Sequence, residues 1–128
     1  MLSSINAWTQ NQDTTSTFLL NEEGSAYIIF DEEFLDIGAL TLGDSLWVIF
    51  TFNNKSDIEL SVSDVEIDCA CMRADFNSEE IIKPGEKGQI RLMFTPRIHG
   101  RFSRNIVVHF KEIEWQYILN FYGQVLRP

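Results

Sequence analysis

The two cysteines are the residues whose type and spacing could most directly do chemistry. Cys69 and Cys71 stand in the stretch EIDCACMRAD, residues 66–75, with one alanine between them. Two thiols at this spacing fit a redox couple, half of a metal site or the packing of small side chains in a core. Which of these three roles applies depends on the secondary structure that positions the two cysteines.

The predicted geometry of this segment favours core packing. If the strand stays extended through residue 71, the two Cα atoms lie about 6.6 Å apart, at about 3.3 Å per residue, near the upper limit of about 6.8 Å for a disulfide. A disulfide becomes feasible only if the chain kinks at Ala70, and a strained one would be comparatively easy to reduce. Alternation also places both cysteines on the apolar face, with Val65 and Ile67. We therefore expect buried free thiols, with a disulfide or redox pair and a metal site as alternatives.

A metal site would need further ligands, since structural zinc usually takes four. The candidates are His99 and His109. The pattern puts His99 in a turn and His109 on the polar face of a strand, and neither has the short spacing of a zinc motif. We expect no cofactor.

No catalytic motif accompanies these residues. Ser, His and Asp are present without a nucleophile elbow, and there is no glycine loop that could cradle a phosphate. The cluster Asp31-Glu32-Glu33 is typical of a solvated turn. We therefore expect no enzymatic activity and assign no catalytic residue.

Length and composition predict one folded domain. The chain has 128 residues, of which 45% are hydrophobic and 12% aromatic, a globular composition. Its formal net charge of −9 disfavours nucleic acid as a partner, because phosphate backbones are bound through Lys and Arg. No run of about 18 apolar residues exists, so we expect no transmembrane segment. The first residues lack the pattern of a secretion signal.

Period-two alternation, typical of half-buried strands, recurs along the chain, whereas helical spacing is almost absent. It predicts strands in residues 45–53, 58–62, 65–71, 88–96, 102–110 and 115–125, with a bulge or turn at Ser63-Asp64 where the apolar parity shifts. The segments TSTFLL (15–20) and SAYIIF (25–30) suggest two early strands. Turns are predicted at Pro84-Gly85 and at Gly100.

These strands predict an all-β fold of two facing sheets, because each sheet must bury its one apolar face against another. We place the sandwich in residues 36–128, with residues 1–35 as an N-terminal extension or additional early strands. One continuous domain is expected.

Candidate binding residues come from the charged and aromatic side chains. Basic residues gather between Lys83 and Arg104, where Arg97, Arg101 and Arg104 could form a polar partner surface. The interpretation we favour is that they neutralise acidic neighbours across a sheet, as opposite charges on adjacent strands do. Trp47, Trp115 and Tyr117 could anchor an interface, although core packing is the role we favour for them.

The order of features from Asp36 to Val125 resembles a bacterial family, the domain of unknown function 1573. The matching segments are Asp36-Ile37-Gly38 with Gly43, then FTFNNKS, VEIDCAC, IIKPGEKGQIRLMFTP, IHGRFSRNI and ILNFYGQV. The family's usual Cys-Gly-Cys-Thr reads Cys69-Ala70-Cys71-Met72 here. Gly38, Gly123 and the turn residues are expected to be structural.

The resemblance implies an immunoglobulin-like antiparallel β-sandwich of about seven to nine strands, similar to major sperm protein and Hydin-type domains. It also implies an exported protein, periplasmic or on the outer surface, of the kind common in Bacteroidota, with no established reaction. We expect a non-catalytic module that binds an unidentified protein or has a structural role, through sheet-face aromatic residues or an exposed edge strand. The alternative is a small thiol-redox or metal-handling protein that uses the cysteine pair.

Overall fold

The computed structural model describes residues 28–128, and within this range the chain forms eight strands and no helix. The strands are β1 Ile28–Phe30, β2 Phe34–Thr41, β3 Leu46–Asn54, β4 Val62–Ile67, β5 Met72–Asp75, β6 Lys87–Phe94, β7 Gly100–Phe110 and β8 Tyr117–Leu126. Of the two expected early strands, TSTFLL lies outside the described residues, and the end of SAYIIF forms β1. The expected division of the chain at residue 36 stays a prediction.

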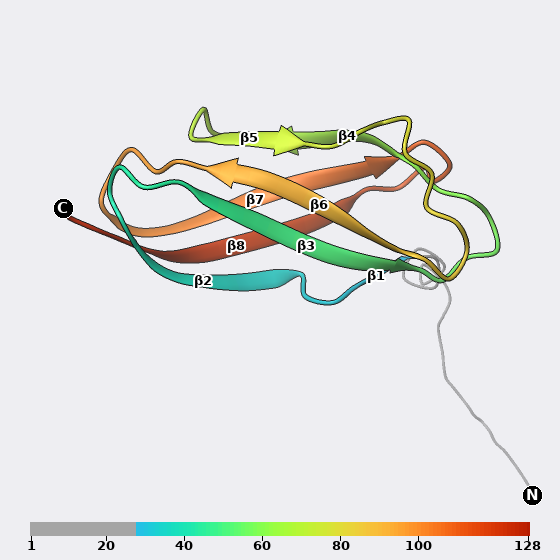
Figure 1. Ribbon diagram of the computed structural model, residues 1–128, viewed down its shortest axis with the longest axis horizontal. Helices are drawn as coiled ribbons and strands as arrows, with labels where there is room; N and C mark the ends of the chain where they lie inside the picture. Colours follow the sequence, from blue (N-terminus) through green and yellow to red (C-terminus); the bar gives the residue numbers. More distant parts are fainter. Residues whose placement is uncertain (1–27) are drawn as a thin grey trace, which may run out of the picture.

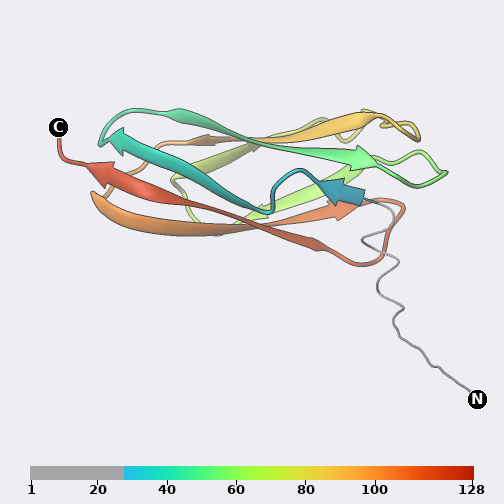
Figure 2. The same ribbon diagram turned by 90° about the horizontal axis from the view of Figure 1, so that it is seen from below.

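Two four-stranded sheets face each other (Figures 1 and 2). One sheet has the strand order β1-β3-β6-β5 and the other β2-β8-β7-β4. The pairs are antiparallel except β2 with β8, which is parallel because the chain changes sheet between β1 and β2. The expected immunoglobulin-like β-sandwich is confirmed.

The core fills the space between the sheets with the inward positions of alternating strands. Strands β3, β6, β7 and β8 confirm four of the runs predicted from alternation. Aromatic rings meet edge to face across the two sheets, as for Phe94 and Phe121, whose centroids lie 5.1 Å apart at 74°. The largest fully buried side chains include Phe50, Phe52, Phe94, Phe121, Leu60, Ile90, Leu92, Ile106 and Leu119.

The region before the cysteines differs from the prediction. Residues 58–62 and 65–71 do not form two strands; β4 spans the end of the first run and the start of the second. The register of β4 against β7 shifts between Val62 and Asp64, which confirms the predicted irregularity. Leu60 instead forms an isolated bridge with Ile82, which takes it out of the sheet.

Glycine is required where β2 approaches β8. A Cβ atom at Gly123 would lie 2.4 Å from the carbonyl oxygen of Gly38, so no side chain fits there. Gly38 itself has φ of 76°, and its amide donates a hydrogen bond to Oδ1 of Asp36 at 2.8 Å. The two strands can therefore pair in parallel through the irregularity between Asp36 and Ala39.

Candidate functional site

The chain turns immediately after β4, and this turn carries both cysteines. It brings the Cα atoms of Cys69 and Cys71 to 5.1 Å, and the two sulfur atoms form a disulfide, so neither cysteine is free. The expectation of free thiols is therefore wrong. It assumed an extended strand through residue 71, whereas the strand ends at Ile67 and the chain bends at Ala70, the condition under which a disulfide becomes feasible.

Backbone hydrogen bonds hold the disulfide turn against the end of β6. The amide of Thr95 donates to the carbonyl oxygen of Cys71 at 2.8 Å, and the amide of Met72 donates to that of Cys69 at 3.2 Å. The Cys71 side chain is buried, and that of Cys69 packs partly against the core. The disulfide is thus part of one end of the sandwich.

A small cavity of about 150 Å³ lies beside this disulfide. Its walls are mostly apolar, with two arginines among them: Cys69, Cys71, Phe94, Pro96, Arg97, Ile98, Phe102, Arg104 and Val125. Arg97 is exposed in the loop between β6 and β7, whereas Arg104 belongs to β7 itself. The cavity therefore combines apolar walls with two cationic groups.

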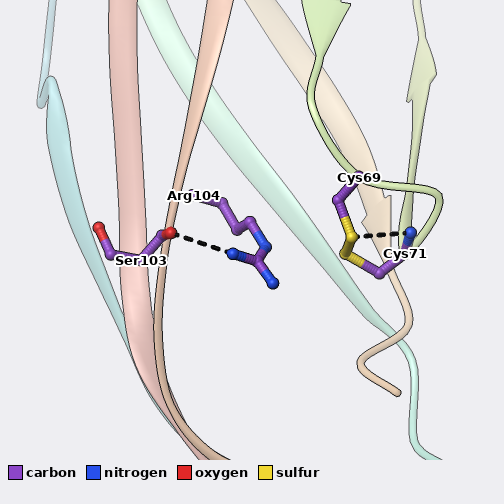
Figure 3. Close-up of a disulfide and its surroundings, with 4 residues drawn as sticks. All are labelled: Cys69, Cys71, Ser103 and Arg104. Atoms are coloured by element: carbon purple, nitrogen blue, oxygen red, sulfur yellow. Dashed lines mark hydrogen bonds between the residues drawn. A yellow bond between two sulfur atoms is a disulfide. The ribbon is translucent and has the colours of Figure 1, made fainter. Parts of the chain in front are cut away.

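Arg104 points inward, on the same side of β7 as Phe102 and Ile106. Figure 3 shows its guanidinium in the space between β7 and the disulfide turn. Its Nε is buried without a hydrogen-bond partner, and Nη1 donates to the carbonyl oxygen of Ser103 at 3.4 Å, longer than a usual hydrogen bond. Neither of the two ion pairs formed among residues 28–128 involves Arg104.

A second feature lies at the opposite end of β6, where the sheet loses a strand. β5 pairs with β6 only from Met72, opposite Phe94, to Asp75, opposite Arg91. In Figure 1 the chain then leaves β6 and loops around the end of the molecule before it returns as β6. The first half of β6 therefore has β3 on one side and no strand of the described chain on the other.

Hydrogen-bond alternation shows which backbone groups are left open there. The amide of Asn54 donates to the carbonyl oxygen of Glu86, so even-numbered residues at this end of the ladder bond to β3. The odd-numbered residues face the β5 side, where the ladder with β5 stops at Arg91. The amide and carbonyl groups of Lys87 and Gln89 consequently point to where β5 would have continued.

A groove of about 530 Å³ occupies this position. Three apolar side chains, Val62, Phe76 and Ile82, line it together with the unpaired part of β6. Apart from Gly88, the remaining lining is polar or charged: Thr51, Asp75, Asn77, Glu80, Lys87, Gly88, Gln89 and Arg91. The unpaired ladder thus faces a space with an apolar side and a polar side.

The histidines are not beside the cysteines. His99 is exposed in the loop before β7, and His109 on the outer face of β7 pairs with Glu66 of β4. Across the described part of the chain, no three His, Cys, Asp or Glu side chains gather as metal ligands. The metal site left open by the sequence is therefore not formed by these residues.

The candidate aromatic residues lie at separate places. Trp47 is 41% exposed on the outer face of β3, and Trp115 precedes β8. Nε1 of Trp115 donates to the hydroxyl of Tyr117 at 3.1 Å, and the Tyr117 ring packs against Phe110. Burial raises the pKa of Tyr117, while the hydrogen bond from Trp115 acts in the opposite direction. Their role in binding stays a prediction.

Arg104, predicted to belong to a polar partner surface, lines the cavity beside the disulfide, and the open half of β6 was not predicted. The inward position of Arg104 could have been predicted from alternation, because it has an even number, like the apolar residues of 102–110 that point inward. Arg101, by contrast, is exposed on β7. The open ladder had no sequence signal, because it depends on where β5 ends.

Comparison with known families decides the assignment. The family described as "Protein of unknown function (DUF1573)" matches residues 28–125. This range covers strands β1 to β7 and all of β8 except its last residue. The chain belongs to this family. No curated protein matches the sequence at a significant level.

Solved structures of low sequence identity share the fold of this DUF1573 domain. The ASH/PapD-like domain 7 of human CEP192 has a TM-score of 0.59 at 9% identity, over 80% of this chain and 87% of that one. WR4, a C. elegans MSP family member, has a TM-score of 0.56 at 11% identity, over 77% and 98%. The CsuC–CsuE chaperone-tip adhesion subunit complex of Acinetobacter baumannii gives 0.56 at 10% identity, over 77% and 56%. At these identities the likeness shows the fold alone.

Among the described residues, no helix is long and apolar enough to cross a bilayer.

Proposed function

We propose that this DUF1573 domain is a non-catalytic β-sandwich module of the cell envelope that binds an extended segment of a partner protein. The segment adds a strand to the open half of β6. The observation that carries this proposal is the pair of backbone positions, Lys87 and Gln89, that face the groove without a strand partner. Strand addition supplies affinity through main-chain hydrogen bonds and specificity through alternate side chains.

The groove supports a specific pattern in the bound segment. Residues directly opposite each other in a sheet point to the same face. A bound residue opposite Gly88 would therefore point inward, toward the side lined by Val62 and Ile82. Its neighbours, opposite Lys87 and Gln89, would point outward to solvent. We expect a segment with a central apolar residue flanked by polar ones.

Charge contributes little to this selectivity. The groove is lined by Lys87 and Arg91 but also by Asp75 and Glu80, so both signs are present in equal number. Arg91 and Asp75 pair with each other at 3.4 Å, on exposed side chains. The apolar position and the backbone ladder should therefore dominate recognition.

The disulfide supports a place outside the reducing cytoplasm. Disulfides persist in oxidising compartments such as the bacterial periplasm and the cell surface, and are rare in the cytosol. The structure joins Cys69 and Cys71 in a disulfide. A solved neighbour in fold, the CsuC–CsuE complex, is itself a chaperone with an adhesion subunit, which supports protein binding as a use of this fold.

The binding mode is tested with a matched pair of variants in β6. Gln89→Pro removes the amide that faces the groove and leaves the β3 ladder, which uses the even-numbered residues, intact. Gln89→Ala removes the side chain and keeps the amide. The purified protein is screened against a displayed library of seven-residue peptides, and the affinity of the enriched peptide is measured by calorimetry for each variant.

We expect the enriched peptides to carry an apolar residue between polar ones. The Gln89→Ala variant should bind them with an affinity within about threefold of that of the parent, and the Gln89→Pro variant at least tenfold more weakly. If the proline destabilises the fold, the parent protein is tested instead with the same peptide methylated at its backbone amides. This peptide should not bind. Absence of enriched peptides, or equal binding by Gln89→Pro, contradicts strand addition.

The compartment is tested in cells of the source organism. Cells are quenched with acid, and thiols are alkylated under denaturing conditions before mass measurement. An exported protein should carry no label at Cys69 or Cys71. Two labels would place the chain in a reducing compartment and contradict the proposal.

A second candidate function, thiol redox exchange, is favoured by the disulfide and its cationic surroundings. Arg97 and Arg104 line the same cavity as both sulfurs, and nearby cations stabilise thiolates. Equilibration with glutathione buffers would give the reduction potential. A potential in the range of thiol oxidoreductases, about −120 to −270 mV, together with turnover of a disulfide substrate, would favour this function, and a lower potential without turnover would contradict it.

A further inference from the structure

The guanidinium of Arg104 is a partly buried cation, with its Nε buried, that has no anionic partner in the described part of the chain. Strand β7 directs it between the sheets, because it occupies an inward position two residues from Phe102 and two from Ile106. Its buried Nε has no hydrogen-bond partner, and Nη1 reaches one distant carbonyl oxygen, that of Ser103. A half-buried charge in apolar surroundings is costly unless it is paired.

Nothing in the described chain supplies the missing anion. Of the acidic side chains in residues 28–128, Asp75 pairs with Arg91 and Glu66 with His109, and none pairs with Arg104. The cavity beside Arg104 is lined by no Asp or Glu. Arg97, the second cation that lines the cavity, adds positive potential beside the unpaired guanidinium of Arg104.

We propose that this cavity binds a carboxylate carried on a short apolar group. The guanidinium of Arg104 offers a planar fork that matches the two oxygens of a carboxylate. The disulfide, Phe94 and Val125 provide apolar walls for the attached group. The volume of about 150 Å³ equals that of roughly five water molecules at about 30 Å³ each, which fits a group of a few carbon atoms.

The carboxylate could come from a free short-chain acid or from the last residue of a polypeptide. Both present the same chemistry to Arg104. This site is separate from the groove of the proposed function, because the two lie at opposite ends of β6, at Phe94 and at Lys87. Its test is therefore independent of strand addition.

The test uses the whole chain and three probes: sodium butyrate, N-acetyl-glycyl-valine and the C-terminal amide of that peptide. Affinity is measured by titration, and the Nε–H resonance of Arg104 is followed by NMR. We expect butyrate, the peptide acid or both to bind and to shift this resonance, and the amide to do neither. Binding by only one of the two acids identifies the source of the carboxylate.

Matched variants on β7 assign the effect to the guanidinium of Arg104. Arg104→Gln should weaken binding of the acid at least tenfold, and Arg104→Lys should weaken it less, because the charge stays while the fork is lost. Arg101→Gln removes the same charge from an exposed position of the same strand and should change affinity less than twofold. Gln89→Pro should have no effect. Equal binding of acid and amide, no binding of either acid, or unchanged affinity in Arg104→Gln would overturn the proposal.

Discussion

The guanidinium carbon of Arg91 lies 4.4 Å from the centroid of the Trp47 ring, on the outer face of the β3–β6 pair. Arg91 also pairs with Asp75, the last residue of β5. The exposed tryptophan is therefore partly covered by a cation that neighbouring strands hold in place. This favours a local packing role for Trp47 over that of an open interface anchor.

Replacing Trp47 with alanine should consequently have a small effect. An exposed cation–π contact contributes about 0.5–1 kcal/mol, so we expect the free energy of unfolding to fall by about that amount, as measured by urea denaturation. Binding of a groove peptide should change less than twofold. A loss of peptide binding with normal stability would instead assign the partner surface to the sheet face.

The disulfide should protect both sulfurs and add modest stability. Alkylation of the native oxidised protein should give no labelled cysteine, and reduction should expose Cys69 and Cys71 to label, as read by mass spectrometry. Chain-entropy reasoning gives about 1.6 kcal/mol for so short a loop, so a Cys69→Ala, Cys71→Ala double variant should lose about that much unfolding free energy. Rapid labelling without reductant would contradict the disulfide.

Asn54 should be the polar side chain whose loss costs most. It is fully buried, and its Nδ2 donates to the carbonyl oxygens of Ile58 and Ile82, while Oδ1 accepts from Ser56. Asn54→Ala leaves these buried groups without partners, at about 1–3 kcal/mol for each one left unsatisfied. We expect a total loss of about 2–4 kcal/mol by denaturation.

The neighbouring residue provides a control for this effect. Asn53 points to the outer face and makes one long contact, 3.5 Å from Nδ2 to Oδ1 of Asp31. Asn53→Ala should cost less than about 0.5 kcal/mol. Similar losses for Asn53→Ala and Asn54→Ala would show that the buried network is not what stabilises this end of β3.

Stability should decline at alkaline pH through Tyr117. Burial raises the pKa of its hydroxyl above the ordinary value of 10.0. As pH rises above that value, the unfolded chain loses this proton before the folded one does, so the folded state binds more protons and stability falls with pH. The contribution is fully present below the unfolded pKa and is lost as pH passes through the folded pKa.

The Tyr117→Phe variant separates this effect from other alkaline titrations. Its melting temperature should fall less steeply above about pH 10 than that of the parent. The two slopes should agree at neutral pH, where the hydroxyl is protonated in both states. Parallel curves over the whole range would show that Tyr117 is not responsible.

Most of the sandwich was predictable because strand alternation is a local property. The runs that became β3, β6, β7 and β8 each carry an apolar side chain at every second position, and burial of that face follows from any two-sheet packing. Strands β2 and β5 were not recognised from alternation. β2 is interrupted at Gly38, and β5 is only four residues long.

The amino-acid sequence alone determined the all-β class, the irregularity at Ser63-Asp64 and the family of this chain. Tertiary structure decided the state of Cys69 and Cys71, because a disulfide depends on how the chain bends after β4. It also decided that Arg104 lines a cavity with its Nε buried and that Lys87 and Gln89 face a groove. The disulfide, the cavity and the groove depend on where one strand ends beside another that is distant in sequence. A local sequence pattern does not contain this information.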